Sequence, residues 1–287
     1  MTCETVYAPN DYKSELKPVW CPGCGDFGVL NALYRAMAEL RLEPSNTVVT
    51  SGIGCSSRLP GYVKTYGFNG VHGRALTLAM GIKIARPELN VIATGGDGDG
   101  VAIGGNHFLH AARRNLNIAY IMMDNEIYGL TKGQAAPTTP TGDKTKSTYY
   151  GNPEQAVDPC ELAISFGATW VARAFSGDVV GTVELMKKAV EHRGFAFLNV
   201  MSPCVTFRGK DQFKTLKAKL QPLPEDHDPA DRYSATRYTR EKDVMTVGIL
   251  YEVSEPTLVD QLLAIRWKAG GDGLTTNEIA KTFMPAL

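Results

Sequence analysis

A glycine-rich turn between two apolar runs constrains the fold of this chain more than any other feature. Residues 91–94 (VIAT) form a short apolar run that ends in glycines, which is typical of a buried parallel strand. The GGDGDG sequence that follows lets the backbone turn sharply and approach a ligand closely, because glycine has no Cβ atom. We expect a helix over 102–114 and a second strand over 118–123, so the unit predicts a strand–helix–strand crossover.

Polar side chains follow both strands of this unit. Asp97 comes after the first strand, and Asp124-Asn125 after the second, at the same predicted edge of the sheet. Asp97, Asn125 and the main-chain carbonyl of Ile127 supply the hard oxygen ligands that Mg²⁺ prefers beside phosphate groups. A GDG turn alone is also compatible with ordinary solvated loop acids, but the Asn 28 positions later makes the pattern resemble the thiamine diphosphate motif. Neither a P-loop nor a Rossmann fingerprint is present.

Charge and composition exclude two classes of partner. The 287 residues include 30 Lys and Arg against 30 Asp and Glu, so no global field attracts nucleic acid or an anionic membrane. No apolar stretch is long enough to span a bilayer, and the first residues lack the pattern of a signal peptide. We therefore expect a cytoplasmic protein with a substantial core, and neither nucleic acid nor membrane as a partner.

Apolar runs alternate with amphipathic segments through most of the chain. This alternation predicts an α/β fold with a doubly wound, mostly parallel sheet that binds ligands at the carboxyl ends of its strands. Asp26 is the expected N-cap of the first helix. The remaining strands are expected at 46–50, 169–174 and 195–201, and the remaining helices at 26–40, 75–85, 158–166 and 181–193.

Two segments fall outside this alternation. Residues 134–157 lack periodicity, which predicts a long, partly mobile loop of the kind that forms lids or partner contacts. We expect residues 1–215 to form the cofactor-binding domain, and 216–287 a C-terminal extension that packs on the domain or on a partner. Within the extension we expect a polar, extended connector over 221–243, a strand over 244–253 and an amphipathic helix over 258–268.

Four of the six cysteines fall in predicted loops at one edge of the sheet. Cys21 and Cys24 form a CxxC, and Cys55 and Cys204 each follow a predicted strand. Soft thiolates in this number suit zinc or an iron–sulfur cluster, although a CxxC also occurs as a redox dithiol and single cysteines as inert small side chains. One CxxC with two distant cysteines favours [4Fe–4S] over zinc. Cys3 and Cys160 stand outside this set, without an assigned role.

Five motifs in order resemble the β subunit of 2-oxoacid:ferredoxin oxidoreductases, most closely the 2-oxoglutarate type. The resemblance covers about residues 10–215 and implies a thiamine diphosphate-binding fold with a [4Fe–4S] cluster close to the thiazolium. The motifs are WCPGCGD, SGIGCSSR, VHGRA, TGGDGDGVAIGGNH and DNEIYGLTKGQ.

The same resemblance implies roles for individual residues. The cluster ligands would be Cys21, Cys24, Cys55 and Cys204, and the Mg²⁺ ligands Asp97, Asn125 and the Ile127 carbonyl. Arg58 and Lys132 would be cations near the substrate, with His72 as a third catalytic residue; salt-bridged loop charges are the alternative for the two cations. The implied cofactor-binding residues are Gly52, Ile53, Cys55, Ser56, His72, Gly73, Gly96, Asp97, Gly98, Asp99, Asn125, Ile127, Tyr128, Gly129, Leu130 and Thr131.

The implied activity is coenzyme A-dependent oxidative decarboxylation of a 2-oxoacid, 2-oxoglutarate to succinyl-CoA and CO₂, with electrons passed through the cluster to ferredoxin. The reverse direction fixes CO₂, as in a reductive TCA cycle. Pyruvate or broad 2-oxoacid specificity, and a non-redox thiamine diphosphate lyase or synthase, are the alternatives. No Glu motif plainly serves the aminopyrimidine, so the resemblance places that Glu on an α subunit. We expect a shared active site and an (αβ)₂ assembly.

Overall fold

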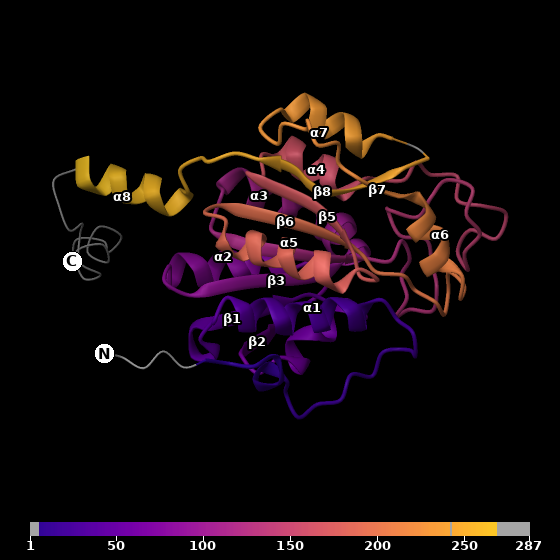
Figure 1. Ribbon diagram of the computed structural model, residues 1–287, viewed down its shortest axis with the longest axis horizontal. Coiled ribbons are helices and arrows are strands. Elements are labelled where there is room, and N and C mark those ends of the chain that lie inside the picture. Colours follow the sequence, from indigo (N-terminus) through magenta and orange to yellow (C-terminus); the bar gives the residue numbers. More distant parts are fainter. Residues whose placement is uncertain (1–5, 242, 269–287) are drawn as a thin grey trace, which may run out of the picture.

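An eight-stranded sheet organises the chain (Figure 1). The computed structural model describes residues 6–241 and 243–268, so Cys3 lies outside the described residues. The strand order is β2-β1-β3-β4-β6-β5-β8-β7, and all neighbours are parallel except β5 and β8. The strands are β1 (Thr47–Ser51), β2 (Tyr66–Asn69), β3 (Asn90–Gly96), β4 (Ile118–Asp124), β5 (Trp170–Phe175), β6 (Phe195–Met201), β7 (Leu220–Pro222) and β8 (Met245–Glu252).

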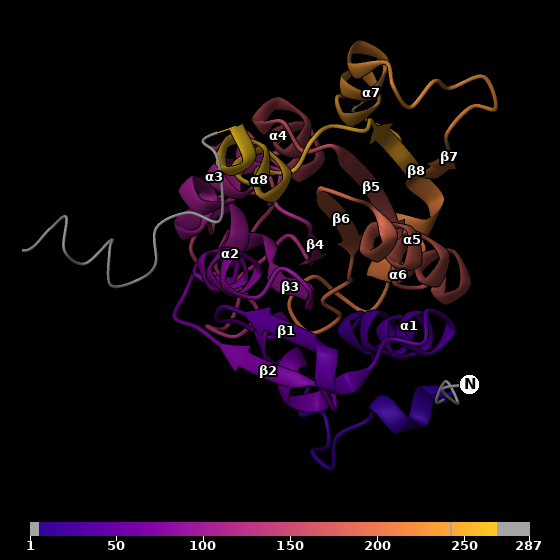
Figure 2. The ribbon, with the colours of Figure 1, turned by 90° about the vertical axis from the view of Figure 1, so that its left-hand side faces the viewer.

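Helices cover both faces of this sheet (Figure 2). One face packs against α1 (Asp26–Glu39) and α5 (Val179–Glu191), and the other against α2 (Ala75–Ala85), α3 (Gly105–Arg114) and α4 (Pro159–Phe166). Successive side chains of a strand point to opposite faces, so Leu198 joins the core on one side and Phe197 the core on the other. The predicted doubly wound, mostly parallel fold is therefore confirmed.

The carboxyl ends of the central strands meet at one edge of the sheet. In the parallel register Ser51 pairs with Thr94, Gly96 with Met123 and Asp124 with Met201. The loops that leave these strand ends carry Cys55, the GDGDG sequence, Asn125 and Cys204. The topology thus brings chemistry-bearing residues from distant parts of the sequence to a single edge.

Two local predictions near this edge were wrong. Asp26 is the first residue of α1 rather than its N-cap, which is Gly25 without a side-chain hydrogen bond. The buried Asp26 carboxylate instead accepts a hydrogen bond from the Ser202 hydroxyl at 2.5 Å. After the GDG turn the chain forms a π-helical turn, Gly98–Ile103, so the regular helix begins at Gly105 rather than at 102.

The C-terminal segment continues the same sheet. The predicted extended connector over 221–243 was wrong, because it contains α7 (Arg232–Thr239), capped by Asp231 and packed through the buried Ala235 and Tyr238. A further helix, α6 (Gln212–Lys219), precedes it, and β8 pairs with β5. The division at 215/216 stays a prediction. The last described helix is α8 (Leu258–Lys268), and shorter 3₁₀ helices span Pro9–Tyr12, Pro44–Asn46 and Ser56–Tyr62.

Within 6–241 and 243–268, every helix is too short or too polar to cross a bilayer.

Candidate active site

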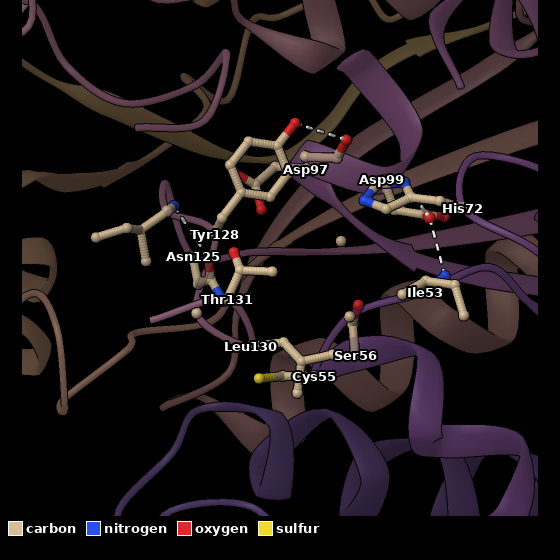
Figure 3. A pocket seen from close by; sticks show the side chains of 15 residues that line it. Ile53, Cys55, Ser56, His72, Asp97, Asp99, Asn125, Tyr128, Leu130 and Thr131 are labelled. Carbon is tan, nitrogen blue, oxygen red and sulfur yellow. Dashed lines mark hydrogen bonds and ion pairs between the residues drawn. The ribbon is translucent and has the colours of Figure 1, made fainter. Parts of the chain in front are cut away.

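A hollow of about 60 Å³ lies at the carboxyl edge, between the loops that follow β1, β2, β3 and β4 (Figure 3). In Figure 3, Asp97, Asp99 and His72 lie along one wall, and Cys55, Ser56 and Leu130 along the opposite wall. The lining residues are Ile53, Gly54, Cys55, Ser56, His72, Gly96, Asp97, Gly98, Asp99, Asn125, Ile127, Tyr128, Gly129, Leu130 and Thr131. Of the residues predicted to bind the cofactor, Gly52 and Gly73 do not line this hollow, and Gly54 lines it without having been predicted.

The Asp97 carboxylate is the buried acid of the pocket. It is 2% exposed, and its Oδ2 accepts a hydrogen bond from the Thr138 hydroxyl at 2.5 Å. Burial, together with the neighbouring Asp124, raises the pKa of Asp97 well above its ordinary value. A carboxylate in this position would be stabilised by a nearby cation. Asn125 and Ile127 line the same pocket, and the Asn125 Oδ1 accepts a hydrogen bond from the Ile127 N–H at 3.0 Å, so an amide oxygen and a main-chain carbonyl are neutral oxygen donors near Asp97. This donor set fits Mg²⁺.

Asp99 fastens two loops to the pocket wall. Its Oδ1 accepts hydrogen bonds from the main-chain N–H groups of Ile53 at 2.9 Å and Gly73 at 2.7 Å. A Cβ atom at Gly52 would lie 2.2 Å from the other oxygen, Oδ2, so only glycine fits there. His72 Nδ1 lies 3.1 Å from Asp99 Oδ1, without the angle of a hydrogen bond. Gly52 and Gly73 therefore shape the pocket through Asp99.

Gly98, the middle glycine of the GDGDG sequence, packs against the aromatic ring of Tyr128. A Cβ atom at Gly98 would lie 2.2 Å from Cε1 of Tyr128, and the Tyr128 hydroxyl donates to the Gly98 carbonyl at 3.2 Å. The turn after β3 and the turn after β4 are thus packed directly on each other. The sequence predicts glycine at position 98 because a ligand approaches the backbone closely. The structure adds a second reason, which is that the Tyr128 ring leaves no room for a Cβ atom.

The four loop cysteines lie at the same edge. A Cβ atom at Gly129 would lie 3.6 Å from Cys55 Sγ and 3.8 Å from Cys204 Sγ. The CxxC loop joins them because the Gly25 N–H donates to the Pro203 carbonyl at 3.0 Å. Among the described residues, no group of three or more His, Cys, Asp or Glu could hold one metal ion. A cubane differs from a single ion in that its four thiolates bind four iron atoms.

A buried carboxylate borders these thiols. Burial, and then the charge of Asp26, raise the pKa of the Cys24 thiol, and the same two causes raise the pKa of Cys55 to about 11. Burial also raises the pKa of Asp26 itself to about 6, against the opposing effect of the Ser202 hydrogen bond. Burial of Cys24 and Cys55 therefore disfavours free thiolates at these two positions and favours a bound cationic group.

The Asp26 shift predicts a pH dependence for the cluster-free chain. Because the folded-state pKa is raised from 3.8 to about 6, the stability that Asp26 contributes is present below pH 4 and is lost as the pH rises through 6. In wild type the free energy of unfolding should fall by up to about 3 kcal/mol across this pH range, and we expect Asp26→Asn to abolish this fall. Urea unfolding between pH 4.5 and 7.5 measures it, with the exposed Asp226→Asn as the matched control. An Asp26→Asn profile with the wild-type slope would contradict the assignment.

The long loop over 134–157 is fastened to the pocket. Besides the Thr138 contact with Asp97, the Thr139 hydroxyl donates to the Glu126 carbonyl at 2.6 Å, and Asn152 Nδ2 donates to the Thr139 carbonyl at 2.8 Å. The loop contains no helix or strand. Sequence reasoning missed Thr138, because a Thr in an aperiodic Pro- and Thr-rich segment carries no signal of a carboxylate partner.

An ion-pair group links the asparagine turn to the last cysteine loop. Arg208 donates to Glu126 Oε2 and to Asp143 Oδ2, both at 2.6 Å. Burial raises the pKa of Glu126 to about 7, although the Arg208 guanidinium opposes the shift. Arg208 follows Cys204 by one turn, and its N–H donates to the Cys204 carbonyl at 2.9 Å. None of these three residues was a predicted site residue.

The two predicted substrate cations lie at the rim. Arg58 is exposed and lines a neighbouring hollow of about 300 Å³ together with Leu16 and Asn69. Lys132 is exposed beside the pocket-lining Thr131 and has a backbone φ of +86°. Neither cation forms an ion pair with another described residue. Salt-bridging within the described chain therefore does not account for them.

Two family models match the chain. "Thiamine pyrophosphate enzyme, C-terminal TPP binding domain" matches residues 52–200, from the loop after β1 into β6. The model of the C-terminal part of the pyruvate ferredoxin oxidoreductase beta subunit matches residues 204–266, from the last pocket cysteine into α8.

Two relatives and one solved structure are similar to the chain over most of its length. Subunit beta of 2-oxoacid:ferredoxin oxidoreductase 2 from Aeropyrum pernix is 50% identical over 197 residues, which cover 69% of this chain and 64% of that subunit. The 2-oxoglutarate synthase subunit KorB of Methanocaldococcus jannaschii is 38% identical over 258 residues, 87% of this chain and 93% of its own. A structure of 2-oxoglutarate:ferredoxin oxidoreductase from Magnetococcus marinus, with 2-oxoglutarate, coenzyme A and succinyl-CoA bound, superposes with a TM-score of 0.93 at 45% identity, over 99% of this chain and 98% of that one. The chain belongs to the β subunits of the 2-oxoacid:ferredoxin oxidoreductases.

Proposed function

We propose that this chain is the β subunit of an enzyme that converts 2-oxoglutarate, coenzyme A and two oxidised ferredoxins to succinyl-CoA, CO₂, a proton and two reduced ferredoxins. The observation that carries the proposal is that Cys55 lines the same hollow as Asp97 and Asn125. The proposed thiamine site and the proposed redox site therefore adjoin each other. This arrangement suits a decarboxylation in which electrons are removed from the cofactor-bound substrate. The two alternatives, another 2-oxoacid and a non-redox lyase, differ in substrate and in the use of the cysteines.

The pocket residues fit the implied groups. Asp97, Asn125 and the Ile127 carbonyl would hold Mg²⁺, and Cys21, Cys24, Cys55 and Cys204 would hold a [4Fe–4S] cluster. Thiamine diphosphate supplies the carbon nucleophile and electron sink that decarboxylation requires. Of this chain's own residues, Asp99 fixes the loops around the pocket, and Tyr128 supports Gly98. Arg58, Lys132 and His72 are the proposed substrate-side residues.

An α subunit fits the exposed surface around the hollow. Ile53 and Leu130 line the pocket and are about half exposed, and all four residues of the edge strand β2 are exposed, with Tyr66 at 61% and Phe68 at 52%. An open edge strand with apolar side chains is typical of a surface covered by a partner. The α subunit would supply the Glu for the aminopyrimidine, and an (αβ)₂ assembly, ferredoxin as acceptor and a cytoplasmic location complete the proposal.

The test is an anaerobic assay of the co-expressed αβ complex. We expect CO₂ release and acceptor reduction that require 2-oxoglutarate and coenzyme A together, and no turnover by this chain alone. Oxidation of a 2-oxoacid by the isolated chain would refute the shared active site. CO₂ release without any reduction of an acceptor would replace the oxidoreductase by the non-redox lyase.

Arg58 provides a prediction about the substrate. The 2-oxoglutarate molecule carries a second carboxylate, which needs a cationic partner when it is desolvated. We expect Arg58→Leu to raise the KM for 2-oxoglutarate about tenfold more than the KM for pyruvate, since a hydrogen bond to a charged group contributes about 1.5–3 kcal/mol. Steady-state kinetics of the αβ complex measure both values, with the exposed Arg113→Leu on α3 as the control. Equal changes for the two substrates would exclude this role.

A further inference from the structure

Basic side chains gather on one surface beside the cysteine loops. Residues 208–219 contain five cations and one carboxylate, although the whole chain is balanced at 30 of each sign. The exposed lysines of this segment and of the 134–157 loop make up what we term the lysine face: Lys144, Lys146, Lys210, Lys214, Lys217 and Lys219. Within the described part of the chain, none of them forms an ion pair.

The two segments form one continuous surface. Lys146 Nζ lies 5.6 Å from the centre of the Phe207 ring, and the Arg208 guanidinium binds Asp143 of the loop. A hollow of about 390 Å³ is lined by both segments, with Lys210 and Lys219 on its helical side. Figure 1 shows α6 and the loop on the same side of the molecule. The charges therefore act together.

This surface borders the proposed cluster ligands. Cys204 lies four positions before the start of the basic segment 208–219. Gly129, which lies next to the sulfur atoms of Cys55 and Cys204, begins the turn that leads to the loop. Phe207 packs on that turn, since a Cβ atom at Gly133 would lie 2.9 Å from its ring. A protein seated on the lysine face would lie beside the loops that hold the cysteines.

The lysine face also has exposed aromatic side chains at its border. Tyr149 is 77% exposed and Tyr150 is 93% exposed, with ring centroids 5.1 Å apart. The alternative is that these lysines only keep an exposed helix solvated. That alternative explains neither the excess of positive charge in this segment nor the two exposed tyrosine rings. Exposed tyrosines are enriched at protein-binding surfaces, and unpaired cations beside them steer the approach of an oppositely charged partner.

We propose that the lysine face is the docking surface for an acidic, one-electron protein carrier. The inference rests on the proposed function, in which each 2-oxoacid releases two electrons, so two carriers must arrive and leave in every turnover. Such exchange requires fast association and fast release, which complementary charge provides and a large apolar interface does not. The apolar rim at β2 suits the permanent α partner instead.

The test uses the αβ complex with Lys214→Glu/Lys217→Glu. Both lysines are exposed, and neither belongs to the proposed catalytic or cofactor-binding residues. The matched control is Arg113→Glu/Lys188→Glu, which changes the net charge by the same four units. Those residues lie in the last turns of α3 and α5, at the opposite, amino edge of the sheet. The acceptors are a purified acidic [4Fe–4S] ferredoxin and, separately, methyl viologen.

We expect the α6 variant to lower kcat/KM for ferredoxin about tenfold at low ionic strength, because surface charge governs steered association. The difference from wild type should shrink as salt is added. Methyl viologen reduction, the KM for coenzyme A and the melting temperature should stay at wild-type values, and the control variant should match wild type with both acceptors. Lys214→Ala/Lys217→Ala should give a smaller loss in the same direction.

Three outcomes would overturn the proposal in distinguishable ways. Normal ferredoxin kinetics in the α6 variant would remove the docking surface and leave the proposed function intact. A higher KM for coenzyme A with unchanged ferredoxin kinetics would assign the lysine face to the phosphates of coenzyme A. Failure of the wild-type complex to reduce methyl viologen with 2-oxoglutarate and coenzyme A would refute the proposed function itself.

Discussion

Asp97→Asn abolishes the retention of thiamine diphosphate and Mg²⁺ and reduces the activity of the αβ complex by more than about 100-fold, because removing even an indirect metal contact typically costs about 10–100-fold. The carboxylate is the buried acid among the proposed magnesium ligands, and an amide of equal size removes only its charge. Fluorescence of the oxidised cofactor after gel filtration measures retention. The melting temperature with and without Mg²⁺ and cofactor measures binding independently of catalysis.

The stability of the ligand-free variant separates cofactor loss from misfolding. Burial and Asp124 raise the pKa of Asp97, so the charged carboxylate is unfavourable without a cation. We therefore expect ligand-free Asp97→Asn to be at least as stable as wild type, yet to gain nothing from Mg²⁺ and cofactor. Thr138→Val, which removes the hydroxyl bound to Asp97, should give a partial loss, and the exposed Glu154→Gln none. Wild-type retention by Asp97→Asn would contradict the magnesium assignment.

Cys55→Ala should remove the iron–sulfur cluster and with it all reduction of ferredoxin. Cys55 Sγ and Cys204 Sγ both lie beside Gly129, and Cys55 is the one cysteine among the described residues that line the pocket. After anaerobic purification we expect about four irons per wild-type chain and the visible absorption of the cluster, both lost in the variant.

Cys160→Ala is the matched control for this experiment. Cys160 is fully buried in α4, where its Sγ contacts the Ala172 carbonyl, and it belongs to the core on the opposite face of the sheet from Cys24 and Cys55. We expect it to keep its iron and its absorption, with at most a small loss of stability from the removed sulfur. Equal iron in wild type and Cys55→Ala, or a wild-type chain that holds zinc or no metal, would rule out the cluster assignment.

The elements predicted best are those in which local pattern and tertiary environment agree. The strand Phe195–Met201 and the helix Ala75–Ala85 have the predicted bounds, because β6 is buried on both faces and α2 is short and bounded by turns. Errors occur where a contact across the sheet decides. Asp is a residue type favoured at N-caps, but the Asp26 side chain is buried and accepts a hydrogen bond from Ser202, which is 176 positions away.

In the connector over 221–243, tertiary contacts stabilise a helix where the composition predicts none. Its polar composition indicates an extended segment, and Asp231 at the start of α7 is the local signal of a helix. Packing of Ala235 and Tyr238 then stabilises α7 against the sheet and α4. Composition alone does not reveal a helix whose stability depends on a few buried contacts.

The sequence by itself determined the parallel α/β architecture and the positions of Asp97, Asn125 and the four cysteines at strand ends. Strand ends share one edge in any parallel sheet, so a linear pattern is enough to bring these residues together. Only the tertiary structure decided which side chains surround them. The Thr138 hydroxyl on Asp97, the Tyr128 ring on Gly98 and the buried Asp26 beside the thiols arise from packing between segments that are far apart in the chain, and no local periodicity encodes such contacts.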